Sequence, residues 1–204
     1  MVRIKICGLF RDCDIDYVNE AKPDYIGFVF AKSRRQVGLE QARQMRGRLD
    51  RDILPVGVFV DAPVGQIIEL YREGIISLAQ LHGQEDDTYI QTLKERCDVP
   101  VIQAVAVKTT ADILCRLSSP ADYLLLDNTA GGSGQSFDWQ QIPDINRPYF
   151  LAGGIDEAKM PAALARQPFG IDISSGAETQ GLKDRDKIRR LLELARRVNG
   201  GKKS

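Results

Sequence analysis

The sequence has few of the residues from which metal sites and disulfide networks are built. It contains one histidine, His82, and four cysteines that lack the paired short spacings of zinc sites and redox dithiols. Because so few soft ligands are present, we expect no metal. The cysteines are therefore judged singly, and they are Cys7, Cys13, Cys97 and Cys115.

Long apolar runs and an excess of charge are also missing. No apolar run approaches the roughly 20 residues of a membrane span, and the N-terminus lacks the features of a signal peptide. Lysine plus arginine and aspartate plus glutamate both count 28, so no global field would gather nucleic acid or an anionic membrane. We therefore expect a cytoplasmic protein that binds a small molecule, with no nucleic acid and no membrane as partner.

Short apolar, β-branched runs recur along the whole chain, and their starts are separated by roughly 21 to 31 residues. This is the span of one strand, one helix and two short loops. Helical periodicity between the runs indicates that strand and helix alternate throughout. The eight runs are IKIC at 4, YIGFVF at 25, VGVFV at 56, LAQLH at 78, VIQAVAV at 101, YLLLD at 123, YFLAGG at 149 and GIDISSG at 170.

Eight such units without a break in composition predict the α/β class and a single-domain (β/α)8 barrel, or TIM barrel, over residues 1–204. A doubly wound open sheet is the alternative. The last helix is predicted in DRDKIRRLLELARRV, which has carboxylates first and arginines last, as the helix dipole favours. Residues 199–204, NGGKKS, are predicted to form a loose C-terminal tail.

Polar residues at alternate strand positions predict a polar barrel interior. Lys5 and Cys7 share one face of the first strand, and Asp172 and Ser174 share one face of the eighth. Because a buried lysine needs a partner, we expect Lys5 to pair with Asp172 or with Asp127.

Two candidate reactive groups lie at strand ends, where TIM barrels carry their chemistry. Cys7 ends the first strand and Asp127 ends the sixth. A thiolate can act as a base and a carboxylic acid as an acid. Structural roles remain open, because free cysteines are often simply buried and an aspartate before NTAGG can serve a turn. His82 is interpreted as an orienting residue in the floor of the site.

Two glycine-rich segments, LAGGI at 151–155 and ISSGAE at 173–178, follow the seventh and eighth strands. Backbone N–H groups at such positions form an anion cradle, which barrels of this class use for phosphate. The predicted phosphate ligands are Gly153, Gly154, Ser174, Ser175 and Gly176.

The loop GGSG at 131–134 lacks the context of a nucleotide-binding motif. We therefore expect no nucleotide cofactor, and we expect this loop to be mobile or to cover the substrate.

Adjacent arginines, Arg34 and Arg35, follow the second strand in AKSRRQV. A planar guanidinium at a strand end is suited to a carboxylate, whereas a solvated charge pair is the alternative. We expect one of the two to hold an anionic group opposite the phosphate.

These motifs together resemble the phosphoribosylanthranilate isomerases of tryptophan biosynthesis over nearly the whole chain. The motifs KICG, GFVF, KSRR, VGVFV, QLHG, LLLD, GGSGQSFDW, AGGI and DISSGAE appear in the family's order and near its spacing. The segment after KICG departs slightly, because Leu9 and Phe10 replace an isoleucine and a small polar residue.

The resemblance implies a (β/α)8 barrel that converts N-(5-phosphoribosyl)anthranilate, a phosphosugar, to 1-(2-carboxyphenylamino)-1-deoxyribulose 5-phosphate. This is an Amadori rearrangement, and it implies no cofactor. By the family pattern Cys7 resembles the general base that removes the C2′ proton, and Asp127 resembles the general acid that opens the ring. Arg35 falls at the position of the arginine that binds the substrate carboxylate, and Arg34 is the less favoured choice.

Two other functions are kept as alternatives. One is the related histidine-pathway isomerase of an aminoimidazole carboxamide ribotide, which resembles two repeated half-barrels and carries an aspartate where Cys7 stands here. The other is a barrel that binds a phosphate ligand without catalysis, because fold alone does not establish activity. The sequence leaves a monomer or a homodimer open.

Overall fold

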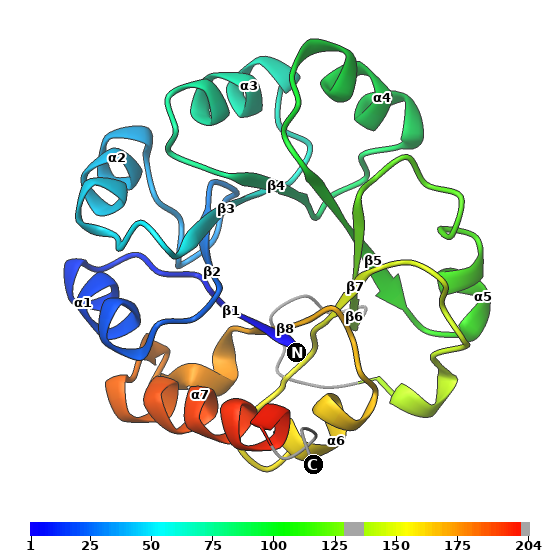
Figure 1. Cartoon of the computed structure of the whole chain (residues 1–204). Coiled ribbons are helices and arrows are strands. Elements are labelled where there is room, and N and C mark those ends of the chain that lie inside the picture. The colour runs from blue at the N-terminus through cyan, green and yellow to red at the C-terminus, as the bar shows by residue number, and fades with distance from the viewer. Residues whose placement is uncertain (129–136, 201–204) are drawn as a thin grey trace.

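Eight parallel strands close into a barrel in the order of the chain. The computed structural model describes residues 1–128 and 137–200, and Figure 1 shows the strands as a ring. The eighth strand pairs with the first, which closes the ring and confirms the predicted TIM barrel. The strands are β1 (Arg3–Cys7), β2 (Tyr25–Val29), β3 (Leu54–Phe59), β4 (Leu78–Leu81), β5 (Val101–Val107), β6 (Tyr123–Asn128), β7 (Tyr149–Leu151) and β8 (Gly170–Ile173).

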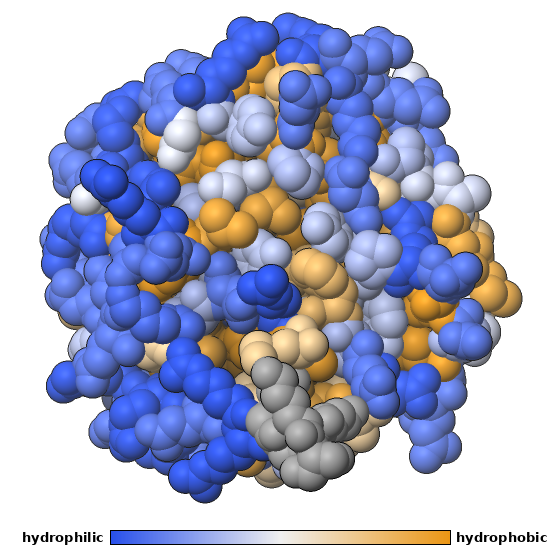
Figure 2. All heavy atoms as spheres, viewed as in Figure 1, coloured by the Kyte–Doolittle hydropathy of each residue, from blue (hydrophilic) through white to orange (hydrophobic). Residues whose placement is uncertain are grey.

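The α-helices form the outer layer of the barrel (Figure 1). Hydrophilic residues dominate the rim of the face in Figure 2, as expected for helices that present one side to solvent. None of the helices within the described ranges is long and apolar enough to cross a membrane. The helices are α1 (Asp12–Ala21), α2 (Leu39–Arg48), α3 (Val64–Arg72), α4 (Asp87–Arg96), α5 (Thr110–Leu114), α6 (Met160–Ala165) and α7 (Arg185–Gly200).

Strict alternation of strand and helix was too simple an expectation. Between β6 and β7, residues 137–148 contain only a 3-10 turn, η1 (Trp139–Gln141). Pro143 and Pro148 in this connection lack the N–H group that a helix interior requires. The predicted substrate-covering loop at 131–134 lies outside the described residues.

The C-terminal boundary also differs from the prediction. Helix α7 continues to Gly200, two residues into the predicted tail at 199–204. No proline interrupts this amphipathic segment, and the helix ends only at Gly200, a residue type that commonly ends helices. Residues 201–204 lie outside the described part of the chain.

The barrel has two apolar cores, separated by its wall. Ile4 and Ile6 point from β1 into the outer core against the helices, and both are fully or almost fully buried. The interior is polar only in part, because a second cluster fills some of the lumen and packs Phe150 beside Gly170. That inner cluster consists of Tyr25, Val56, Leu78, Ile102, Leu125, Phe150 and Ala152. The remaining inward positions carry the polar groups of the site.

Candidate active site

A buried ion pair joins the first and last strands of the barrel. Lys5 and Asp172 are register partners across the β1–β8 seam, and Lys5 Nζ donates to Asp172 Oδ1 at 2.9 Å. This confirms the predicted pairing of Lys5, with Asp172 as the partner rather than Asp127. Burial alone would lower the pKa of Lys5, but the charges of Asp172 and Cys7 outweigh it and raise the pKa. Lys5 is therefore a permanent cation under the site.

The Cys7 thiol lies at the end of β1, beside this cation. Its sulfur occupies space that only a glycine at position 27 of β2 leaves open, because a Cβ there would lie 2.7 Å from Sγ. Burial and the negative charge of Asp172 raise the pKa of Cys7, and the positive charges of Lys5 and Lys183 oppose that rise. The thiol is thus shielded from water but faces two ammonium groups that favour its thiolate form.

Asp127, at the end of β6, is held by a short chain of polar groups. Its Oδ1 accepts a hydrogen bond from the Asn128 N–H at 2.8 Å, and its Oδ2 lies 3.7 Å from His82 Nε2. The other ring nitrogen of His82, Nδ1, contacts Gln80 Nε2 at 2.9 Å. Burial raises the pKa of Asp127, with the hydrogen bond from Asn128 and the nearby His82 acting in the opposite direction. A raised pKa suits a carboxyl group that must donate a proton.

A cavity of about 290 Å³ opens beside this carboxyl group, between the ends of β4, β5 and β6. His82 and Asp127 both line it, so the acid is accessible from the mouth of the barrel. The placement of His82 agrees with its interpretation as an orienting residue, which stays a prediction. The complete lining is His82, Gly83, Gln84, Ala104, Val105, Ala106, Asp127 and Asn128.

The structure brings the two glycine-rich segments together at the ends of β7 and β8. Gly153 and Gly154 adopt positive φ angles of 94° and 60°, which side chains rarely tolerate. A Cβ at Gly176 would overlap the carbonyl oxygen of Ile155, so the two loops touch where the glycine stands. The Ser174 hydroxyl donates to the Cys7 carbonyl at 3.3 Å, which ties this region to the end of β1. Of the five predicted phosphate ligands, Ser174 thus contacts Cys7 directly, and the role of all five as ligands stays a prediction.

The two arginines after β2 share a carboxylate that the sequence analysis did not select. Arg35 donates from Nε and Nη2 to Glu178 at 2.7 and 2.9 Å, and Arg34 Nη2 donates at 2.7 Å. Lys183 Nζ donates to the same Glu178 at 2.7 Å. Glu178 and Lys183 face each other on a small hairpin, β9 (Glu178–Thr179) and β10 (Leu182–Lys183). Arg34 and Arg35 are therefore not simply a solvated charge pair.

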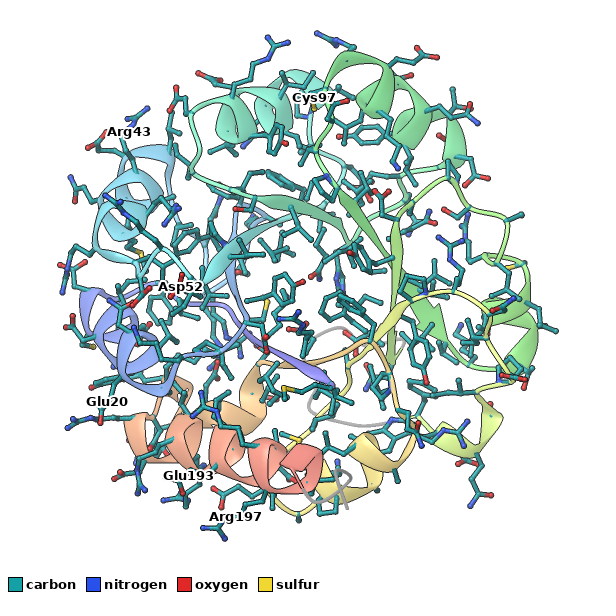
Figure 3. All side chains as sticks on the ribbon, viewed as in Figure 1. Glu20, Arg43, Asp52, Cys97, Glu193 and Arg197 are labelled. Carbon is teal, nitrogen blue, oxygen red and sulfur yellow. The ribbon has the colours of Figure 1, made fainter. Side chains whose placement is uncertain are left out.

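Cys7 is set apart from the other three cysteines by its position. Cys97 caps the C-terminus of α4, and Figure 3 shows it at the periphery of the molecule beside α3 and α4. Cys115 is exposed at the end of α5, and Cys13 belongs to α1. Among the cysteines, Cys7 alone lies at the mouth of the barrel.

Fold and site together define a TIM barrel with a thiol and a carboxyl group at its strand ends. A family model described as "N-(5'phosphoribosyl)anthranilate (PRA) isomerase" matches residues 4–194, and the chain belongs to this family. An N-(5'-phosphoribosyl)anthranilate isomerase of Endomicrobium trichonymphae is 43% identical over 201 residues, which cover 96% of this chain and 99% of that protein. The family is not that of the histidine-pathway isomerase kept as an alternative.

Solved structures give the same assignment. The crystal structure of phosphoribosyl anthranilate isomerase from Thermus thermophilus aligns with a TM-score of 0.88 at 31% identity, over 97% of this chain and 100% of that one. A second phosphoribosyl anthranilate isomerase aligns with a TM-score of 0.85 at 33% identity, over 96% and 99%. That protein was crystallised with reduced 1-(o-carboxyphenylamino)-1-deoxyribulose 5-phosphate.

Proposed function

We propose that Cys7 and Asp127 are the general base and the general acid of a phosphoribosylanthranilate isomerase that serves tryptophan biosynthesis. The observation that carries this assignment is the placement of a buried thiol beside Lys5 and a carboxyl with a raised pKa, both at strand ends around one barrel mouth. The reaction converts N-(5-phosphoribosyl)anthranilate to 1-(2-carboxyphenylamino)-1-deoxyribulose 5-phosphate.

The chemistry needs one proton donor and one proton acceptor. Asp127 protonates the ring oxygen of the ribose, the C1′–O bond breaks, and the nitrogen lone pair forms a Schiff base at C1′. The cationic nitrogen makes the C2′ proton acidic, so the Cys7 thiolate removes it and leaves an enolamine. Tautomerisation of the enolamine gives the ketone product, with no net change in atoms or electrons between substrate and product.

The two ends of the substrate need separate anion-binding groups. Gly153, Gly154 and the segment from Ser174 to Gly176 are half-buried loop positions that offer backbone and hydroxyl groups for the phosphate. Arg35 is the group proposed for the carboxylate. Holding both ends would fix the ribose between acid and base and turn binding energy into orientation. The ligand of the aligned crystal structure carries a carboxyphenyl group at one end and a phosphate at the other.

The cellular setting follows from the chemistry of the chain. Four free cysteines suit a reducing compartment, so we place the protein in the cytoplasm. The partner is the phosphosugar substrate, and the protein acts as a monomer or a homodimer.

The proposed function is tested by measuring turnover of the substrate by the wild type and by a variant that lacks the Cys7 thiol. N-(5-phosphoribosyl)anthranilate is generated in place by a purified phosphoribosyltransferase, and its loss is followed by fluorescence. We expect Cys7→Ala to lower kcat by about 10²- to 10⁴-fold, the typical contribution of a general base. Cys115→Ala, which alters an exposed thiol, is the matched control and should keep full activity. A folded wild-type protein without turnover would refute the assignment.

The pH dependence should reveal an unusual protonation state. The active form needs neutral Asp127 and ionised Cys7, yet burial raises the pKa of both groups, and the ordinary pKa of a thiol already lies well above that of a carboxyl. The active form is therefore the minor one, and kcat/KM should follow a bell between the two pKa values. The acidic limb lies above the ordinary aspartate value of about 3.9, and the alkaline limb above the ordinary thiol value of about 8.5. A profile that falls on neither its acidic nor its alkaline side would contradict this pairing.

A further inference from the structure

A single buried carboxylate connects three cations at one side of the barrel mouth. The Glu178 side chain is 4% exposed, and it accepts hydrogen bonds from Arg34, Arg35 and Lys183. Burial would raise the pKa of Glu178, but its bonds to Arg35 and Lys183 prevail and lower it. Glu178 is therefore ionised, and three cations around one carboxylate leave an excess of positive charge for an anionic ligand.

Arg35 is fixed more completely than the other arginine. It uses both Nε and Nη2 on the two oxygens of Glu178, which is the bidentate geometry that orients a guanidinium most strictly. Its side chain is 13% exposed, against 59% for Arg34. Its Nη1 forms no hydrogen bond with a described residue in the structure, so one edge of the guanidinium stays available.

The stem of Arg35 lies directly over the end of β1. A Cβ at Gly8 would lie 2.5 Å from Arg35 Cδ, and Gly8 has a φ of 82°. The residue after Cys7 must therefore lack a side chain for Arg35 to cross at this point. The crossing places the arginine stem against Gly8, the residue that follows Cys7.

Lys183 connects the same carboxylate to the predicted phosphate loop. Its Nζ donates to Glu178 Oε1 at 2.7 Å and to the Ser174 carbonyl at 2.9 Å. Glu178 is thus joined on one side to the arginine after β2 and on the other side to the loop after β8. The two predicted anion-binding ends of the site share this one residue.

We propose that Glu178 is a positioning residue for substrate binding, which holds Arg35 over β1 with its Nη1 edge ready for the substrate carboxylate. The proposal rests on the proposed function, in which Arg35 binds that carboxylate. A free arginine side chain loses rotamer entropy when it binds a ligand, and an arginine already held by Glu178 has lost it on folding. The substrate then binds more tightly without touching Glu178.

Two other roles of Glu178 predict different changes in KM and Tm. If Glu178 competed with the substrate for Arg35, its removal would free the arginine and lower KM. If Glu178 only stabilised the hairpin, its removal would lower Tm and leave the effect of Arg35 on KM intact. The kinetic constants and Tm of the same variants separate these three roles.

The experiment is a double-mutant cycle between Glu178→Gln and Arg35→Met, measured as KM, kcat and Tm. Loss of an orienting partner costs about 10- to 100-fold in affinity at metal sites, and we expect KM to rise about 10-fold in Glu178→Gln with kcat within about threefold. In the Arg35→Met background the same change should have no further effect on KM, because Glu178 acts through Arg35. Glu157→Gln, which breaks a surface pair with Arg190, is the matched control and should change neither constant.

Two inhibitors show which end of the site is affected. Inhibition by reduced 1-(o-carboxyphenylamino)-1-deoxyribulose 5-phosphate should weaken about 10-fold in Glu178→Gln, whereas inhibition by inorganic phosphate should not change. Glu178→Asp keeps the charge on a shorter side chain, and an intermediate KM is expected for it. It replaces the glutamine variant in the cycle if the latter does not fold.

The outcomes separate this proposal from the proposed function. If Arg35→Met leaves KM unchanged, the role of Arg35 in the proposed function fails, and the positioning role fails with it. If Arg35→Met raises KM but Glu178→Gln does not, or if their effects multiply, the positioning role alone is overturned. A fall in KM for Glu178→Gln overturns it in favour of competition.

Discussion

Replacement of Asp127 by asparagine is expected to lower kcat by about 10²- to 10⁴-fold and to raise Tm. Asparagine keeps the shape of the side chain but has no proton to give to the ring oxygen. Burial raises the pKa of Asp127 in the folded protein, so its ionised form destabilises the fold at neutral pH and a neutral amide relieves that cost. A gain of about 1 kcal/mol corresponds to roughly 2 to 4 °C in a protein of this size.

The sign of the stability change can be checked by pH. Below the unfolded-state pKa of about 3.9, Asp127 is neutral in both states and the variant should match the wild type. As pH rises through the raised folded-state pKa, the wild type loses the stability that the neutral carboxyl provided, and the difference in Tm should grow. Asp98→Asn, at an exposed position, controls for the loss of a charge. A variant with full activity, or with a lower Tm at pH 7, would contradict the assignment.

Replacement of Lys5 by methionine is expected to have the largest effect on stability. Asp172 would keep its charge in a buried site but lose the ammonium group 2.9 Å away. Breaking a buried ion pair by removing one partner costs about 3 to 5 kcal/mol, or roughly 10 °C in Tm at this chain length. Urea unfolding followed by circular dichroism would measure the loss. The variant should also be inactive, since Lys5 opposes the rise in the pKa of Cys7.

A second variant separates the lost charge pair from a general packing defect. Lys5→Met combined with Asp172→Leu removes both charges, and an apolar pair of this kind is often neutral or stabilising. The double variant should therefore recover most of the stability but not the activity. If the single variant is as stable as the wild type, or the double variant is less stable than the single one, the ion pair does not support the barrel as inferred.

Much of this site could be predicted from the sequence because strand geometry is regular. A period of two places Lys5 and Cys7 on the inward face of β1, and the run of eight units places the last strand beside the first. Those two facts predicted that Lys5 pairs with Asp172 or Asp127, and the structure shows Asp172 as the partner. The distinct roles of Cys7, Asp127 and Arg35 came from the resemblance to a family, since spacing alone left each of them a structural alternative.

The parts of the site and the fold that the sequence did not predict depend on irregular backbone. Glu178 follows the eighth strand, where a short hairpin turns it toward residues 143 and 144 positions earlier in the chain. The strands of this hairpin are two residues long, which is too short for an alternating hydrophobic pattern to predict them. In residues 137–148 the structure has a 3-10 turn in place of the α-helix that regular alternation predicted, because the prolines there disfavour a helix interior.

The seam between β1 and β8 has a consequence for the order in which the protein acquires its function. Lys5 and Asp172 are 167 positions apart, and contacts of such separation form late because a long loop must close first. During synthesis Cys7 is made well before Asp172, Ser174, Glu178 and Lys183. A growing chain that has not yet reached Asp172 holds Lys5 without its carboxylate partner. The same chain holds the Cys7 thiol without the positive charge of Lys183. Enzyme activity should therefore appear only when the ring of strands closes, which makes turnover a direct probe of the last step of folding.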